Sequence, residues 1–190
     1  IKVTYAELLS KSICELDGVE AAARVYRETD IPVRGNGANM ENVDVMYVDP
    51  YEFGTVAFST YDMNPYHLNA YLNAMSRNEE ALVVSNNLMS QLGLKPGDSL
   101  TVTNAAGSIT GTVIAGVDAW PGFEKYHETE RGRVYETAFV VGNLSKLFFE
   151  HEIRPYSFWV KRAPGMTDAA LYQTFTDSEF GLKSMESATQ

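Results

Sequence analysis

Residues 81–122 read ALVVSNNLMSQLGLKPGDSLTVTNAAGSITGTVIAGVDAWPG, and nearly every position in this stretch has a readable structural role. The apolar run that contains Val83 and Val84 predicts a short strand. Ser85 is a good N-cap residue and predicts that a short helix follows directly. The apolar face of this helix comprises Leu88, Met89 and Leu92.

The helix is expected to end at Gly93, which adopts the left-handed C′ conformation easily, and Pro96 prevents its continuation. Gly97 and Asp98 then turn the chain into a Thr/Val strand, and we expect the Asp98 carboxylate to organise this turn rather than to act as a general base. Residues 104–107 predict a four-residue hairpin loop. The return strand presents Ile109, Val113, Ala115 and Val117 on one face. None of these positions requires catalytic chemistry.

These motifs together resemble the extracytoplasmic domain of the FtsX-like (MacB-type) ABC transporter permeases. The resemblance rests on V-S-x-x-L, then L-G-L-K-P-G-D, a Thr/Val hairpin, and I-A-G-V running into W-P-G. Two further runs resemble the first half of that domain, D-G-V-E-A-A at 17–22 and V-D-V-M-Y-V-D-P-Y-E-F at 43–53. In this family the domain lies outside the membrane between two transmembrane helices, which implies that Ile1 and Gln190 both face the membrane.

The resemblance implies that residues 1–190 are a single extracytoplasmic domain, excised from a membrane protein and located at the extracytoplasmic face of the cell membrane. It implies two subdomains joined by a hinge, one from about 1–60 plus 135–190 and one from about 61–134. The implied function is non-catalytic: the domain contacts a substrate or partner protein and couples to ATP-driven motion of the transmembrane helices.

The implied partners are an ABC ATPase subunit or domain, reached through the membrane part of the parent chain, and a second permease copy or an accessory extracytoplasmic protein. No cofactor is expected. Two alternatives remain open. A small β-barrel module of a larger soluble enzyme would close residues 83–117 on themselves and bind a nucleotide-like cofactor. A secreted binding protein would have no transmembrane helix downstream.

Composition limits the function further. A chain of 190 residues can bury one sizeable core or two small ones. The formal net charge of −10 argues against a nucleic-acid partner, because such binders neutralise phosphates with clustered Lys and Arg. The acidity serves solubility or forms an acidic groove for a cationic ligand. The single cysteine, Cys14, excludes an internal disulfide framework.

Periodicity and capping signals predict the remaining elements. Helices are expected at 5–16, where Thr4-x-x-Glu7 forms a capping box, after the Asn64-Pro65 pair, at 144–152, and at 168–175 behind Thr167. Strands are expected at 19–26, from Val43 to the break at Asp49-Pro50, at 138–141 and at 157–161. A loop is expected at 31–42, because this segment contains Pro32, Gly35 and Gly37. A second loop, long and exposed, is expected at 118–133. Because no regular βαβ rhythm is present, the predicted class is α+β, with a mixed sheet, packed helices and a small β-rich subdomain that contains the helix-turn-hairpin unit.

The best candidate for contact with a substrate or partner is the aromatic Pro-Gly segment formed by Trp120, Pro121, Phe123 and Tyr126. Aromatic side chains at such a turn offer a large contact area at small entropic cost. The alternative is that Trp120 and Phe123 close one end of the core.

Catalytic motifs are weak in this sequence. The His-Glu pairs at His127 and His151 lack the second histidine of a zincin, and His67 stands alone on a predicted helix. The Gly-Asn-Gly run at 35–37 lacks the third glycine of a dinucleotide fingerprint. No Gly-x-Ser-x-Gly elbow is present. We therefore predict neither a metal site nor a catalytic site.

Overall fold

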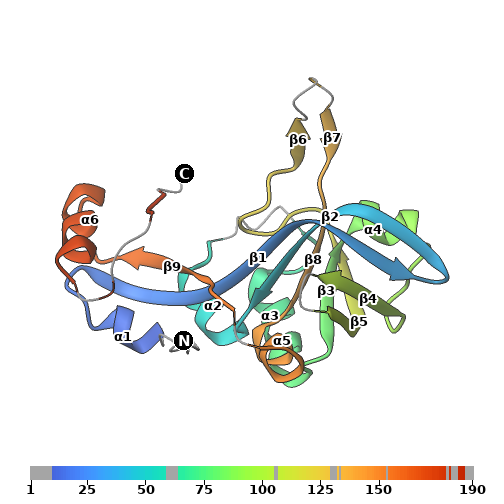
Figure 1. Cartoon of the computed structure of the whole chain (residues 1–190), viewed down its shortest axis with the longest axis horizontal. Coiled ribbons are helices and arrows are strands. Elements are labelled where there is room, and N and C mark those ends of the chain that lie inside the picture. Colours follow the sequence, from blue (N-terminus) through green and yellow to red (C-terminus); the bar gives the residue numbers. More distant parts are fainter. Residues whose placement is uncertain are drawn as a thin grey trace, which may run out of the picture.

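The computed structural model describes residues 10–58, 64–104, 107–128, 132, 134–152, 154–178, 180 and 184–186 (Figure 1). The strands are β1 (Val19–Gly35), β2 (Ala38–Val48), β3 (Ala81–Ser85), β4 (Ser99–Asn104), β5 (Gly107–Val117), β6 (Tyr126–Glu128), β7 (Val134–Glu136), β8 (Ala138–Asn143) and β9 (Ser157–Arg162). The helices are α1 (Ser10–Cys14), α2 (Pro50–Val56), α3 (Leu68–Arg77), α4 (Asn86–Gln91), α5 (Leu144–Glu150) and α6 (Asp168–Asp177). Mixed strand pairing with interspersed helices confirms the predicted α+β class.

Six of the strands close into a small barrel. Neighbouring strands pair in the order β2-β8-β3-β5-β4-β1, and β1 pairs again with β2. Closure depends on the length of β1: Val33 pairs with Met40 of β2 on one edge and with Val102 of β4 on the other. The β2–β8 and β3–β5 pairs are parallel, and the other pairs of the barrel are antiparallel. The barrel therefore has no free edge where these pairings are made.

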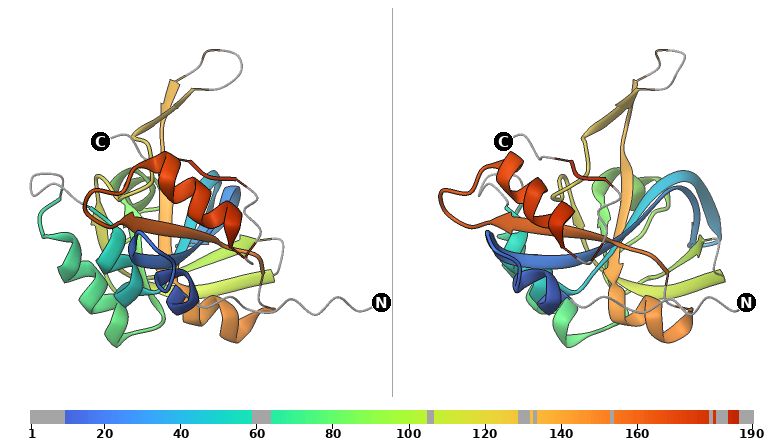
Figure 2. Two further views of the ribbon diagram at one scale, coloured as in Figure 1. Left: turned by 90° about the vertical axis from the view of Figure 1, so that its left-hand side faces the viewer. Right: turned by 60° about the vertical axis from the view of Figure 1, so that its left-hand side comes forward.

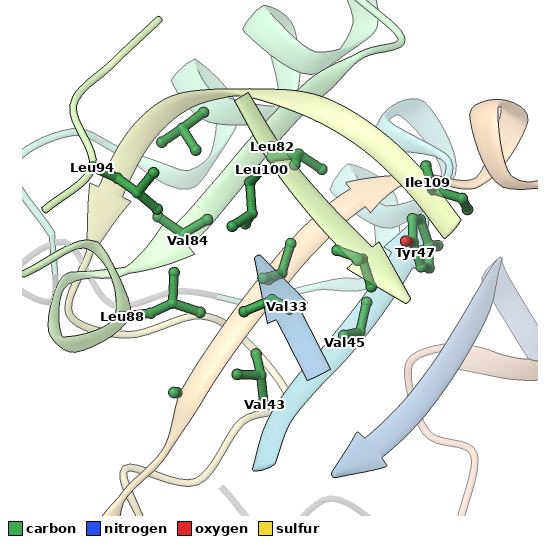
Figure 3. Packing of buried hydrophobic residues seen from close by; sticks show 14 of the residues in the cluster. Val33, Val43, Val45, Tyr47, Leu82, Val84, Leu88, Leu94, Leu100 and Ile109 are labelled. Carbon is green, nitrogen blue, oxygen red and sulfur yellow. The ribbon is translucent and has the colours of Figure 1, made fainter. Parts of the chain in front are cut away.

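Side chains alternate between the inside and the outside of the barrel, and on β3 and β8 both sides are buried. The inner core includes Val33, Val43, Val45, Tyr47, Leu82, Val84, Leu88, Leu94, Leu100 and Ile109, which lie together in Figure 3. The outer core, between the barrel and helices α2 and α3, includes Val25, Met46, Val48, Phe53, Leu68, Tyr71, Leu72, Met75, Val83, Trp120, Phe139 and Val141. Strands buried on both faces read as continuous apolar runs, which explains the run at 81–84.

The helix-turn-hairpin unit forms largely as its sequence predicts. Gly93 ends α4 with φ 61°, and the backbone N–H of Lys95 donates to Asp98 Oδ2 at 2.8 Å, which confirms that this carboxylate organises the turn. Ser85 occupies the N-cap position, but its hydroxyl accepts from the backbone N–H of Phe139 instead of capping α4. The unit does not close on itself, because β4 pairs with β1 and β3 pairs with β8.

The loop expected at 31–42 is wrong, because this segment is the far end of a β1–β2 ribbon. Asn36 (φ 49°) and Gly37 (φ 77°) form a two-residue turn. Gly35 pairs with Ala38 across that turn. Asn-Gly suits a two-residue hairpin because both central residues need positive φ. The glycines that indicated a loop therefore make the turn between two strands.

Pro32 was the other reason to expect a loop, because proline donates no ladder hydrogen bond. It lies inside β1, at the register shift between Ile31 and Val33. A shift of this kind leaves one residue outside the regular pairing, so the missing N–H of proline costs little there. The ribbon therefore accommodates Pro32 without a break.

Two helix starts also differ from expectation. Asp49-Pro50, expected only to end a strand, begins α2: Asp49 Oδ1 accepts from the backbone N–H groups of Tyr51 and Glu52. The second predicted helix begins later than Asn64-Pro65, at Leu68, and His67 is its N-cap residue. Thr167, expected to cap the last helix, does cap α6, and Asn143, directly before the helix expected at 144–152, is the N-cap residue of α5.

An arm extends from the barrel, formed by β9 and residues 19–25 of β1 with helices α1 and α6 packed against them (Figure 1). Its small core comprises Ile13, Ala22, Leu171 and Phe175. The predicted first helix is described only from Ser10, so its capping box and start lie outside the described residues. The proposed division into two subdomains stays a prediction, since strands of both segments share one sheet.

One ion-pair network joins the arm to the barrel. The Glu52 carboxylate of α2 accepts from the Arg24 guanidinium of β1 (Nη2 to Oε1, 2.8 Å), from the Arg24 backbone N–H (3.0 Å) and from the Ser10 hydroxyl of α1 (2.6 Å). Its side chain is 14% exposed. Burial acts to raise the pKa of Glu52, but the hydrogen bonds from Arg24 and Ser10 outweigh it and hold the pKa below the ordinary 4.5.

We predict that Glu52→Gln lowers the free energy of unfolding by about 1–3 kcal/mol at pH 7, because it removes a charge-assisted network from a largely buried site. Urea unfolding of the 190-residue chain measures this. Glu20→Gln, which breaks an exposed pair with Lys161, is the matched control and should change stability by less than about 1 kcal/mol.

The effect of Glu52→Gln on the free energy of unfolding depends on pH. A carboxyl whose folded pKa is lowered stabilises the fold above its unfolded pKa, and this contribution disappears as the pH falls through the folded value. The stability difference between the original chain and Glu52→Gln should therefore be constant above about pH 5 and shrink below the ordinary value of 4.5. A difference that grows on acidification contradicts this assignment.

Candidate functional site

Strands β6 and β7 form a hairpin that projects away from the barrel (Figures 1 and 2). Its register pairs Tyr126 with Glu136, His127 with Tyr135, and Glu128 with Val134. The expectation of one long exposed loop at 118–133 is therefore wrong: its first part packs on the barrel and its last part enters this hairpin. Trp120, Pro121, Phe123 and Tyr126, the four predicted contact residues, lie on the approach to the hairpin or in β6.

Trp120 lies in the outer core and is only 2% exposed. Its ring stacks on Phe53 of α2 at a centroid distance of 5.9 Å and meets the edge of Tyr71 of α3 at 6.5 Å. This is the position that the alternative interpretation gave it, closure of the core. Trp120 offers no surface to a partner in this conformation.

The next predicted residues become more exposed along the chain. Phe123 and Pro121 are half-buried, and the Phe123 ring stacks on Phe139 at 4.6 Å while the Arg27 guanidinium lies 5.1 Å from its centre. Tyr126 is 54% exposed. Of the four predicted contact residues, Tyr126 is therefore the one that presents most of its side chain to solvent.

Asn64 holds the start of this segment in place. Its Oδ1 accepts from the backbone N–H groups of Asp118 (3.0 Å) and Ala119 (3.2 Å), and its Nδ2 donates to the Ala119 carbonyl (2.7 Å). Asn64 was expected to cap a helix. It instead fixes the chain directly before Trp120, which explains why this irregular segment is placed so tightly.

Gly122 allows the segment to approach the arm. It has φ 90°, and a Cβ atom there would lie 2.4 Å from Trp159 Cη2 of β9 and 3.1 Å from Met46 Cε of β2. Any other residue would combine strained backbone with steric overlap. The Pro-Gly turn is therefore the point at which arm, barrel and hairpin approach meet.

A hydrogen bond between His127 and Asp44 connects the hairpin to the barrel wall. His127 Nε2 lies 3.0 Å from Asp44 Oδ2, and the Asp44 side chain of β2 is almost completely buried. The imidazole ring also stacks on Tyr135 at 5.7 Å. This face of the hairpin is turned toward the barrel, since cross-strand partners share one face.

The other face carries apolar side chains that are largely exposed to solvent. Tyr126 and Val134 lie on it, and Val134 is 64% exposed. A two-stranded hairpin has no core of its own, so exposed apolar side chains on it indicate an interaction surface. Sequence reasoning missed Val134 and Tyr135; the alternation in V-Y-E opposite Y-H-E was the signal available.

The histidines occupy unrelated places. His67 caps α3, His127 bonds to Asp44, and His151 follows α5. Over the part of the chain that the structure describes, no three His, Cys, Asp or Glu side chains gather as metal ligands would. In the same residues no helix has both the length and the apolar character needed to cross a membrane.

This barrel with its helix-covered arm is the fold of the extracytoplasmic domains of ABC transporter permeases. The extracellular domain of the ABC-type transporter YknZ from Gram-positive bacteria superposes with a TM-score of 0.53 at 11% identity, over 86% of this chain and 74% of that one. The periplasmic region of MacB from Actinobacillus actinomycetemcomitans gives 0.50 at 7% identity, over 88% and 69%.

A domain of a protein described as a permease from Porphyromonas gingivalis gives a TM-score of 0.52 at 17% identity, over 87% of this chain and 71% of that one. The sequence itself matches no protein-family model and no curated protein sequence. At these identities the likeness establishes the fold, which confirms the resemblance seen in the motifs of residues 81–122.

We predict that His127→Phe lowers the free energy of unfolding by about 1–3 kcal/mol, because Asp44 loses its hydrogen-bond partner while the ring stacked on Tyr135 is kept. Urea unfolding measures this, with Asp44→Ala and the double variant completing a cycle. The two single changes should not add, since both remove the same bond. Additive losses contradict a direct interaction.

Proposed function

We propose that this chain is the extracytoplasmic domain of an ABC transporter permease and acts as a non-catalytic module. It contacts a substrate or partner protein through the β6–β7 hairpin and couples this contact to ATP-driven motion of the parent's transmembrane helices. The fold carries this proposal: it is similar to an extracellular domain of an ABC-type transporter, the periplasmic region of MacB and a permease domain over 86–88% of the chain. ATP would be hydrolysed by a separate subunit or domain that reaches this one through the membrane.

The arm is the part of the domain on which motion of the transmembrane helices would act. Val19, at the start of β1, pairs with Arg162, at the end of β9, so α1 and α6 adjoin the same end of the sheet. Transmembrane helices joined before α1 and after α6 would therefore both act on the arm. A displacement applied there reaches the barrel along β1, which runs through both parts as one strand.

The contact between Trp159 and Gly122 supplies a route from the arm to the hairpin. Trp159 belongs to β9, its ring lies 5.2 Å from that of Phe53, and it closes over the Pro-Gly turn. From Gly122 the chain continues through Phe123 into β6. Close-packed contacts of this kind transmit displacement because little free volume is available to absorb it.

We predict that Cys14 reacts with a membrane-impermeant sulfonated maleimide in intact cells that produce the full-length parent protein. Cys14 is exposed and is the only cysteine of these 190 residues. Labelling is read by mass spectrometry of the Cys14 peptide, and Cys14→Ser is the control. Labelling that occurs only after the cytoplasmic membrane is permeabilised contradicts an extracytoplasmic location.

A second prediction concerns the contact surface. The photo-crosslinker p-benzoylphenylalanine at Tyr126 of the full-length protein in cells should yield a crosslinked product, and inactivation of the ATPase should change its yield. The same residue at Tyr172, an exposed aromatic position of α6, is the matched control and should not give this product. Identical products from the two positions, or none from Tyr126, contradict the assignment of the hairpin.

A further inference from the structure

A hollow of about 140 Å³ lies at the root of the hairpin, between the chain that enters β6, the end of β7, and the first turn of α4. Phe123 and Phe139 provide its apolar part, with their rings stacked at 4.6 Å. Asn87 and Thr137 contribute polar groups to its lining. This hollow is distinct from the buried core and from the hydrogen bond between His127 and Asp44.

Thr137 contributes a hydroxyl that the fold leaves unused. The residue is 4% exposed, and its hydroxyl has no hydrogen-bond partner within the described residues. Its backbone is fixed at both ends, because its N–H donates to the Lys125 carbonyl (3.0 Å) and its own carbonyl accepts from Asn87 Nδ2 (3.1 Å). An unpaired buried hydroxyl is costly, so a polar group arriving in the hollow gains a prepared partner.

The charges around the hollow are mainly negative. Asp118, Glu124 and Glu136 contribute carboxylates, and Lys125 is the one cation among the lining residues. The Lys125 ammonium lies 5.5 Å from the centre of the Tyr126 ring. The Arg27 guanidinium lies 5.1 Å from the centre of the Phe123 ring, so three carboxylates stand against two cations, and the remaining negative charge attracts a further cation.

The hollow is continuous with the exposed face of the hairpin. Glu136, which lines the hollow, pairs with Tyr126 across the two strands, and cross-strand partners share one face. Val134 lies two residues before Glu136 and therefore points to the same side. An acidic hollow with an aromatic floor thus adjoins a small exposed apolar surface.

We propose that this hollow receives a lysine or arginine side chain of a partner protein whose neighbouring apolar residues pack on Tyr126 and Val134. The aliphatic stem lies against Phe123, and the cationic group reaches the carboxylates. The Thr137 hydroxyl, which is buried beneath the lining, turns about χ1 to accept from this cationic group. This inference rests on the proposed function, because it states the chemistry of the partner that the hairpin contacts. The acidic character of the whole chain, −10, favours the same kind of partner.

The test is an NMR titration of the ¹⁵N-labelled 190-residue chain with three probes: Nα-acetyl-lysine N-methylamide, its arginine counterpart, and the neutral norleucine counterpart. We expect the lysine or arginine probe to shift the backbone amides of Asn87, Glu124 and Thr137 with a dissociation constant of about millimolar order, as suits a contact of few atoms. The norleucine probe should bind at least about fivefold more weakly. Equal binding of the neutral probe, or shifts confined to other regions, overturns the proposal.

Two variants and one control locate the binding. Glu124→Gln combined with Glu136→Gln should weaken the basic probe at least about fivefold. Thr137→Val keeps the shape of the side chain, should fold because the lost hydroxyl was unpaired, and should also weaken the probe. Glu79→Gln removes an exposed carboxylate beyond the other end of β3 and should leave binding unchanged. Equal effects of all three changes mean non-specific attraction and overturn the proposal.

Failure of this inference is distinguishable from failure of the proposed function. If the basic probes do not bind while the Tyr126 crosslink forms, the hairpin contacts a partner of other chemistry and the inference alone is wrong. If the probes bind in the hollow and the crosslink is absent, the basic-side-chain site stands and the proposed function is wrong.

Discussion

The structure depends on the way one long strand, β1, divides its two edges among three neighbours. One edge pairs with β2 from Val25 to Gly35, and the other pairs first with β9 and then, from Val33, with β4. The pairing of β1 with β4 closes the barrel, and the pairing of β1 with β9 builds the arm. Both contacts are made by one continuous backbone, so β1 links the arm directly to the barrel. The Glu52 network reinforces this union at the junction.

Much of the fold was predictable where the signals are local. In residues 81–117 the capping residues and the alternation of apolar and polar side chains predict a strand, a helix and a hairpin, and the structure has these elements. The ribbon at 31–42 was missed because its stability comes from pairing with β2 and β4, which no local window shows, while Pro32 and the turn glycines indicate a loop. Helix α2 was missed because Asp49-Pro50 was interpreted as a strand end, although it is equally a helix start.

The candidate site was predicted in outline but not in its residues. Aromatic composition drew attention to the Trp120 segment, yet composition cannot separate a ring that fills a core from one that meets a partner. Trp120 does the first, and Tyr126, six residues later, is exposed. The difference arises from tertiary contacts with Phe53 and Tyr71, which lie far away in sequence. The hairpin and its acidic hollow could be recognised only from the three-dimensional structure.

The central claim is that this fold serves as the outer domain of a membrane permease. The most direct measurement is the sequence of the parent reading frame on both sides of residues 1–190. The account predicts an apolar run of about 20 residues directly before Ile1 and another soon after Gln190, each able to span a bilayer as a helix. A parent frame with neither run contradicts the permease assignment and favours a soluble or secreted protein with the same fold.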